Sequence, residues 1–241
     1  MKKMQCLSIA VLFSAAVVAA PKGEFWEKKD YKQWSRKEVT RMLEKSPWAQ
    51  QFTNQGVGIG DMDPDSMDGT QPYIKYQVQL RSAQPIRQAI VRQMALNQKY
   101  DSLSSEQKQQ FDKSAEAFLS VDVSNAVVVY ITYETNNIEY DRQLARHWQS
   151  QTLDLLKNYV YLSSNKGDKV PLANYSADQG GGRSFQFIFP REVNGNPIVD
   201  PMKDNSLKLE FNYPAIEDLR NGNVFMEFKL EKMIFDGNVA Y

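Results

Sequence analysis

Strict alternation between apolar and polar side chains is the feature that most limits what this chain can fold into. It is clearest at residues 73–81, 184–189 and 207–213, and it recurs from Met226 to Leu230. Successive side chains of a β-strand point to opposite faces, so these segments predict strands with one core face and one wet face. Residues 126–133 are apolar on both sides, which predicts a central strand covered on both faces.

The last strand changes phase along its length. Lys232 occupies the next inward position after Leu230, whereas Met233 and Phe235 follow the opposite alternation. One extra residue near Glu231, forming a β-bulge, would return both halves to the core. The pairs Asn194-Gly195, Asn221-Gly222 and Asp236-Gly237 predict tight chain reversals.

Helices are predicted in the first two-thirds of the chain. Capping boxes at Ser35 and Glu38 and at Ser104 and Gln107 mark two helix starts. Residues 85–120 read as a helical hairpin, in which Ile86, Ile90 and Met94 are spaced four apart. A helix from 140 to 157 carries an apolar stripe formed by Leu144, Trp148, Thr152 and Leu155. Residues 54–72 and 163–182 are the long loops. The fold class is therefore α+β, a mainly antiparallel β-sheet or sandwich with inserted helices, forming a single domain over 20–241.

The first nineteen residues read as a signal peptide. Lys2 and Lys3 precede an apolar run from Leu7 to Ala20, which is shorter than the roughly 20 residues of a membrane span. We predict cleavage after Ala19, because cleavage one residue later would place Pro21 just past the cut. A retained anchor is the alternative. The mature chain is then expected in the periplasm or outside the cell, with no transmembrane span.

Cysteine content and charge exclude several classes of protein. Cys6 is the sole cysteine and leaves with the signal, which removes disulfides, thiol nucleophiles and Cys-bound metals. Loss of Lys2 and Lys3 leaves 27 basic against 29 acidic side chains, a net charge of −2. Such a balance provides no positive field for a polyanion, so nucleic acid is not an expected partner.

An acidic loop is the best candidate for binding a metal ion. Four carboxylates spaced along residues 61–68 offer the oxygen ligands that Ca²⁺ prefers: Asp61, Asp63, Asp65 and Asp68. Calcium is the one cofactor that the sequence suggests. The EF-hand pattern fails, because Ser66 replaces the turn glycine and Pro72 replaces the bidentate glutamate. A solvated turn is the alternative interpretation.

A glycine run offers a weaker candidate for anion binding. Gly180, Gly181 and Gly182 precede Arg183, so backbone N–H groups and a guanidinium could face one anion. Phosphate-binding glycine loops normally open a helix, whereas this run leads into a strand. A flexible entry to that strand is the alternative.

Catalytic motifs are sparse. His147 is the single histidine and no G-x-S-x-G elbow accompanies it, so a flank or surface role is favoured over that of a general base. A pair of carboxylates could hydrolyse a glycoside without histidine or cysteine. Four glutamates near strands are the candidates, although spacing alone pairs none of them: Glu134, Glu192, Glu210 and Glu227.

The sequence resembles a group of secreted bacterial proteins of uncharacterised activity. The likeness rests on Gln33 to Glu38 (QWSRKE), Ser46 to Ala49 (SPWA), Pro85 to Ala89 (PIRQA) and Gly180 to Arg183, with Phe187 to Arg191. It implies export and one shared fold. It implies no activity and no set of catalytic residues.

Three hypotheses of function follow from these observations. The first is an exported binding or structural protein without catalysis, whose partner is an envelope or extracellular protein. The alternatives are a carboxylate-dependent hydrolase of polysaccharide and a calcium-dependent adhesion module. Export, near-neutral charge and the absence of a nucleophile motif favour the first.

Overall fold

The computed structural model describes residues 23–55, 73–178, 180, 182–216 and 221–241. The predicted signal peptide and the acidic loop at 61–69 lie outside these residues. The predicted α+β class is confirmed, because helices combine with sheets whose strand pairs are all antiparallel. No helix within the described ranges is long and apolar enough to cross a bilayer.

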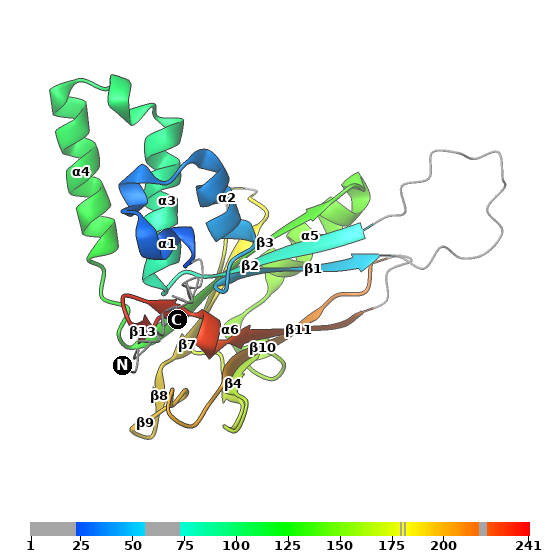
Figure 1. Cartoon of the computed structure of the whole chain (residues 1–241). Coiled ribbons are helices and arrows are strands. Elements are labelled where there is room, and N and C mark those ends of the chain that lie inside the picture. Colours follow the sequence, from blue (N-terminus) through cyan, green and yellow to red (C-terminus); the bar gives the residue numbers. More distant parts are fainter. Residues whose placement is uncertain (1–22, 56–72, 179, 181, 217–220) are drawn as a thin grey trace, which may run out of the picture.

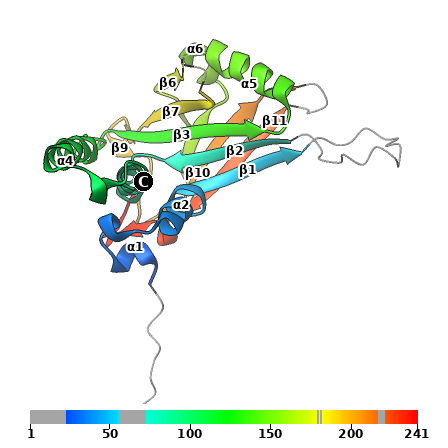
Figure 2. The ribbon, with the colours of Figure 1, turned by 90° about the horizontal axis from the view of Figure 1, so that it is seen from above.

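The larger sheet has five strands in the order β1-β2-β3-β7-β6 (Figures 1 and 2). Their bounds are β1 Ala49–Gln55, β2 Tyr73–Leu80, β3 Ala126–Thr135, β6 Asn174–Ala177 and β7 Ser184–Pro190. The smaller sheet has the order β11-β10-β4-β5. Its strands are β4 Tyr161–Ser164, β5 Val170–Pro171, β10 Ser206–Tyr213 and β11 Gly222–Lys229. The strands predicted at 73–81, 126–133, 184–189 and 207–213 are thus confirmed.

The two sheets pack face to face, as a sandwich. Register sets Tyr76 of β2 opposite Tyr133 of β3, and places Phe187 of β7 on the same inner face. The Phe211 ring of β10 lies 5.7 Å from Tyr76 and 5.5 Å from Phe187, edge to face in both pairs. Aromatic pairs in this geometry stabilise a core beyond the area they bury. The inner faces of the alternating strands therefore form the core.

The helices gather at two ends of the larger sheet (Figure 2). At one end lie α1 Phe25–Lys28, η1 Tyr31–Gln33, α2 Arg36–Glu44, α3 Gln84–Asn97, η2 Tyr100–Ser102 and α4 Ser105–Leu119. At the other end lie α5 Ile138–Ser150 and α6 Leu153–Leu156. Trp148 of α5 enters the sandwich and stacks on Phe185 of β7 at a centroid distance of 4.0 Å.

Both predicted capping boxes are confirmed. Ser35 Oγ accepts the Glu38 N–H at 3.3 Å, and Glu38 Oε2 accepts the Ser35 N–H at 2.9 Å. Ser104 and Gln107 do the same at the start of α4. The hairpin predicted over 85–120 is formed by α3 and α4.

The helix predicted over 140–157 is wrong in its length. It ends at Ser150, and α6 starts after Thr152, whose side chain accepts the Leu155 N–H. A threonine hydroxyl in this position favours a helix N-cap over a helix interior. Leu155, which the periodicity assigned to the apolar stripe, is 49% exposed.

The predicted bulge near Glu231 is also wrong. The turn η3 Leu230–Lys232 follows β11 directly and leads to β12 Ile234–Phe235. This 3₁₀ turn buries Leu230 and Met233 while it leaves Lys232 exposed. The turn shifts the inward-facing positions by one residue, as a bulge would, but it does not pair with a second strand.

Two turn pairs form hairpins as predicted. Asn194-Gly195 joins β8 Glu192–Val193 to β9 Asn196–Pro197, and Asp236-Gly237 joins β12 to β13 Asn238–Val239. All four turn residues have positive φ, as a type I′ turn requires.

Two further expectations need correction, and one strand was not predicted. Residues 163–182, predicted as a loop, contain the end of β4, all of β5 and β6, because short edge strands have too few residues to show alternation. The strand β1, at the other edge of its sheet, carries no apolar alternation and was not predicted. β3 is central, but its outer face is half-buried and not covered.

Candidate functional site

At the described residues of the glycine run, carboxylates of the chain itself occupy the positions where an anion would bind. Gly180 N–H donates to Asp178 Oδ1 at 2.8 Å, and the same carboxylate packs closely against Gly182. Arg183 forms a two-point ion pair with Asp141, at 2.8 and 2.9 Å. Gly181 lies outside the described residues. An incoming anion would have to displace two carboxylates here.

The predicted calcium ligands Asp61, Asp63, Asp65 and Asp68 lie outside the described residues. Within the described ranges, no group of three or more His, Cys, Asp or Glu side chains converges as a metal site would require.

His147 lies at the end of α5, against Trp148 and a hollow of about 490 Å³. Burial lowers the pKa of His147, so its neutral form is favoured. The ring of Trp148 meets it edge to face, with centroids 4.9 Å apart. This packing is that of a histidine on the flank of the core.

Three of the four candidate glutamates are held by lysines. Glu134 pairs with Lys75 at 2.5 Å, Glu210 with Lys169 at 2.6 Å and Glu227 with Lys229 at 2.8 Å. The fourth, Glu192, is exposed on β8. Hydrogen bonds from Lys229 and Ser206 lower the pKa of Glu227. A glycosidase acid needs a raised pKa.

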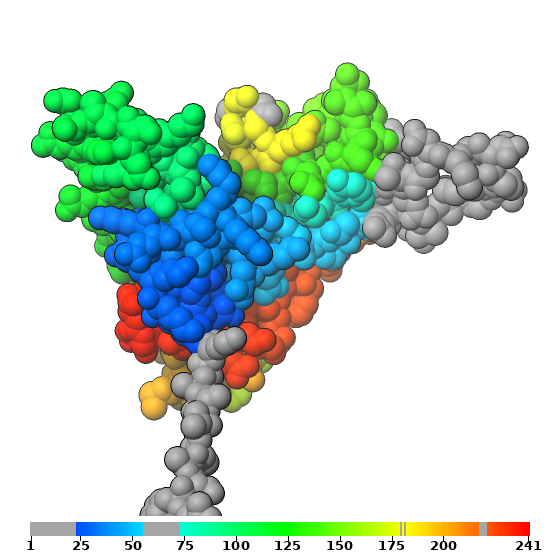
Figure 3. Space-filling view, turned by 45° about the horizontal axis from the view of Figure 1, so that its top comes forward, coloured from blue at the N-terminus to red at the C-terminus, as the bar shows by residue number. Residues whose placement is uncertain are grey.

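The helical hairpin combines exposed apolar side chains with a helix that has no buried residue. α4 has fifteen residues and none of them is buried, although its stripe of Phe111, Ala115 and Phe118 faces α3. Phe118 is 39% exposed, and Met94 on α3 is 51% exposed. Figure 3 shows the hairpin, in green, projecting from the body of the molecule. Packing of an apolar face normally stabilises a helix, and in α4 much of the apolar face is not covered by other side chains.

The seam between α3 and α4 is hollow on both sides. Val91, Phe111 and Ala115 border both hollows. The outer hollow has a volume of about 460 Å³, and its polar side chains are uncharged, as in Gln98 and Gln110. The second hollow, of about 670 Å³, lies between the hairpin and η1. We call it the hairpin cleft.

Charged side chains border the hairpin cleft. Lys32 of η1 and Arg92 of α3 form a basic wall, whereas Asp112 and Glu116 of α4 lie on the acidic side with Asp101 of η2. No ion pair joins the two walls in the part of the chain that the structure covers. The cleft therefore presents opposite charges to whatever enters it.

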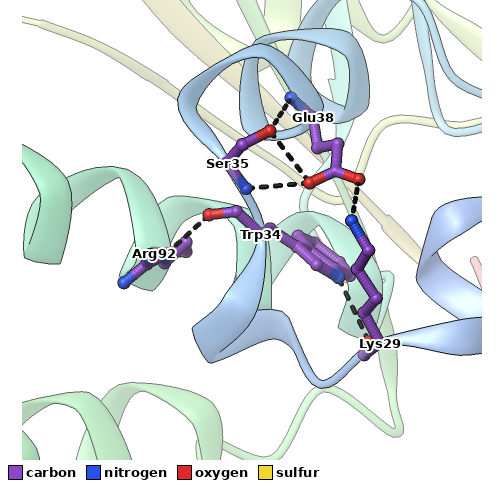
Figure 4. A network of polar contacts seen from close by, with 5 residues as sticks. All are labelled: Lys29, Trp34, Ser35, Glu38 and Arg92. Carbon is purple, nitrogen blue, oxygen red and sulfur yellow. Dashed lines mark hydrogen bonds and ion pairs between the residues drawn. The ribbon is translucent and has the colours of Figure 1, made fainter.

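The basic wall is fixed by a polar network shown in Figure 4. Arg92 Nε donates to the carbonyl of Trp34 at 2.8 Å, and Trp34 Nε1 donates to the carbonyl of Lys29 at 3.2 Å. Lys29 Nζ in turn pairs with Glu38 at 2.6 Å. The network joins α3 to the segment that carries η1, so Lys32 and Arg92 belong to one supported wall.

The acidic wall is held in a different way. Tyr100 donates its hydroxyl to both oxygens of Asp112, at 3.0 and 2.8 Å, and its ring packs edge to face with Phe111 at 5.3 Å. This hydrogen bond raises the pKa of Tyr100. Burial raises the pKa of Tyr31 as well; the charge of Lys32 opposes this increase, whereas Asp30 and Asp112 add to it. Two tyrosine rings therefore border the cleft in their neutral form.

Arg87 fixes the base of α4. It is a buried arginine of α3, 5% exposed, and donates to the carbonyls of Val121 and Phe118 at the end of α4. Burial lowers the pKa of Arg87. The hairpin is thus tied at its base by Arg87 and at its tip by Tyr100, with the open seam between them.

Sequence reasoning identified the hairpin but not its cleft. The stripe of Ile86, Ile90 and Met94 predicted the face of α3, yet the buried residues also include Ala89, Val91 and Ala95, and Met94 is half-exposed. α4 has three large apolar side chains among its fifteen residues. This composition is the sequence signal that could have indicated a helix with little of its surface covered.

No protein-family model matches the chain, and no curated protein sequence matches it. Among solved structures, a protein of unknown function from Burkholderia pseudomallei matches with a TM-score of 0.39 at 10% sequence identity. The match covers 71% of this chain and 77% of that one. A similarity of this size assigns no function.

Proposed function

We propose that the protein is an exported, non-catalytic binding protein of the periplasm or the extracellular space. Its partner is another envelope or extracellular protein, bound at the surface of the helical hairpin. The observation that carries the proposal is α4, a well-capped helix without a buried residue and with a hollow on either side. Met94 and Phe118 are exposed apolar side chains at the border of the outer hollow, and exposed apolar surface can mark an interaction site.

The charge state of the carboxylates supports binding over hydrolysis. Where a carboxyl group of the described residues has a shifted pKa, that pKa is lowered. In Glu38, Asp200 and Glu227 a lysine partner is the largest cause. Each of these groups is ionised at neutral pH. Lysine-paired carboxylates fit structural ion pairs better than the proton donor of a glycosidase.

The proposal is tested by capture of the tagged, exported protein from its native envelope after mild crosslinking. We expect one partner at near-stoichiometric amounts with the wild type. Met94→Glu and Phe118→Glu place a charge on the hairpin surface and are expected to lower its recovery about tenfold.

Matched controls are available elsewhere on the chain. Met202 is 95% exposed and Phe225, on β11, is 58% exposed. Met202→Glu and Phe225→Glu should leave recovery of the partner unchanged. Equal recovery with all four variants, each shown to be folded by circular dichroism, would overturn the assignment to the hairpin. Absence of any specific partner would overturn the proposed function.

A further inference from the structure

We propose that the hairpin cleft binds a short peptide segment of the partner, apolar in part and carrying basic residues. This inference rests on the proposed function, because it names the chemistry of the segment that a binding protein would take up at this surface. It concerns the cleft between η1, α3 and α4, whereas the capture experiment above probes the outer hollow through Met94 and Phe118.

The floor and size of the cleft suit a peptide. Its floor contains Val91, Ala95 and Leu119, and its volume of about 670 Å³ falls within the range of roughly 300–1,000 Å³ typical of ligand sites. Tyr31 and Tyr100 add two aromatic rings at the border. Aromatic rings of this kind pack against apolar side chains while their hydroxyls remain wet.

Charge determines the type of peptide. The acidic side contributes three carboxylates, of Asp101, Asp112 and Glu116, against the two cations of Lys32 and Arg92. Lys108 lies beside Asp101 and Tyr100 and offsets part of this negative charge, so basic residues of a segment are favoured at Asp112 and Glu116 on α4. The basic wall would accept a carboxylate or the carbonyl groups of the same segment.

Two of the acids also have a suitable spacing. Asp112 and Glu116 are four residues apart on α4 and so about 6 Å apart along its axis. This distance is close to the spacing of about 6.7 Å between alternate side chains of an extended peptide, and it equals the rise of about 6 Å over four residues of a helical peptide. Successive basic side chains on one face of a peptide could therefore meet both acids.

Two charges of the cleft can be changed without altering its packing. The carboxylate of Glu116 and the ammonium of Lys32 make no ion pair with the other described residues, and both residues are exposed. Asp112 and Arg92, in contrast, hold Tyr100 and the Trp34 carbonyl. Glu116→Gln and Lys32→Gln are therefore the informative variants, and Glu192→Gln, on the exposed hairpin of β8, is the matched control.

The test uses a library of random dodecapeptides displayed on phage, selected against the exported protein. We expect enrichment of peptides that combine Lys or Arg with apolar residues. The dissociation constant of the best peptide is then measured by fluorescence anisotropy. Glu116→Gln should weaken binding about threefold in 0.05 M salt, with a smaller effect in 0.3 M salt, and replacing the basic residues of the peptide should abolish the difference. Lys32→Gln should change affinity, and Glu192→Gln should not.

Three results would overturn the inference. One is a selection without enrichment of basic residues, and the second is equal binding by the wild type and both cleft variants. The third is binding of phosphatidylethanolamine vesicles that depends on Glu116 and Lys32, without peptide enrichment, which would assign the cleft to a lipid. If capture of a partner still depends on Met94 and Phe118 in these cases, the proposed function stands and the inference alone fails.

Discussion

At the scale of single residues, Glu38 shows how one side chain serves two elements. It completes the capping box of α2 and pairs with Lys29, whose backbone carbonyl accepts the indole N–H of the buried Trp34. The hydrogen bond from Lys29, followed by that from the Ser35 N–H, lowers the pKa of Glu38 from 4.5 to about 2. Ser35 and Glu38 were predictable from sequence because a capping box is local, whereas Lys29 was not.

The lowered pKa of Glu38 predicts a pH-dependent stability. In the unfolded chain the pKa returns to 4.5, so the stabilisation is complete above that pH and is lost as the pH falls towards 2. We expect Glu38→Gln to lower the free energy of unfolding by about 1 kcal/mol at pH 7, and by progressively less between pH 4.5 and pH 2. Urea denaturation of both proteins across this range measures the difference. A difference independent of pH would contradict the assignment, and Glu192→Gln is the control.

Two tyrosines that line the sandwich interior are expected to differ in how removal of the hydroxyl group changes stability. Tyr175 donates its hydroxyl to the carbonyl of Trp148 at 2.5 Å. The Tyr76 hydroxyl and the Trp148 indole N–H are both buried, and neither makes a hydrogen bond of normal geometry with the described residues; burial raises the pKa of Tyr76 above its usual range, and the nearby indole N–H opposes that increase.

Removal of each hydroxyl separates the two cases. Tyr175→Phe should lower the free energy of unfolding by about 1 kcal/mol, since it deletes a hydrogen bond. Tyr76→Phe should leave the melting temperature unchanged or raise it, because its hydroxyl is desolvated without compensation. Thermal denaturation of both variants is the measurement. A loss of stability in Tyr76→Phe equal to that in Tyr175→Phe would mean that the Tyr76 hydroxyl is bonded.

At the scale of elements, the helices differ in how their sequence relates to their packing. α2 and α5 have strong apolar stripes and bury them, including Val39 and Met42 on α2 and Leu144 and Trp148 on α5. α4 has a weak stripe and buries nothing. Its orientation therefore depends on the contacts at its two ends, of which Arg87 at the base is the buried one.

Arg87 is expected to control the order of α4. Arg87→Met would leave the carbonyls of Val121 and Phe118 without their charged donor, at a cost of about 2 kcal/mol. Hydrogen exchange should then accelerate in residues 105–119 but not in β3 or β7. Arg146→Met, which changes an exposed arginine of α5, should leave hydrogen exchange in α4 at its wild-type rate. Acceleration throughout the chain would show that Arg87 supports the core and not the helix.

At the scale of the whole molecule, the chain joins a continuous core to one projecting hairpin. The core is formed by the inner faces of two antiparallel sheets and by Trp148 between them. The hairpin contributes Ile86 and Ala89 to that core, near the start of α3, whereas α4 contributes none of its side chains. A rigid body that carries a partly uncovered element is an arrangement suited to binding, as we propose.

Export is the prediction that belongs to this scale. Expression of the full chain in a bacterium with a periplasm should yield a mature protein that begins at Ala20, as measured by intact mass and N-terminal sequencing. Ala19→Leu removes the small residue before the cut and should slow processing. A protein that keeps Met1 and remains in the cytoplasm would contradict export, and with it the location of the proposed partner.

The sequence by itself determined the α+β class, the strands with clear alternation, both capping boxes and the type I′ turns at residues 194–195 and 236–237. Each of these features depends on neighbours a few residues away, so a local pattern contains the necessary information. Only the tertiary structure decided the edge strands, the division of α5 from α6, and the hairpin cleft. The cleft combines Lys32, Arg92 and Glu116 from three elements, and their approach depends on how α3 packs against α2 and how Arg87 and Tyr100 hold α4. Distances of that kind arise from packing and leave no periodic trace in the sequence.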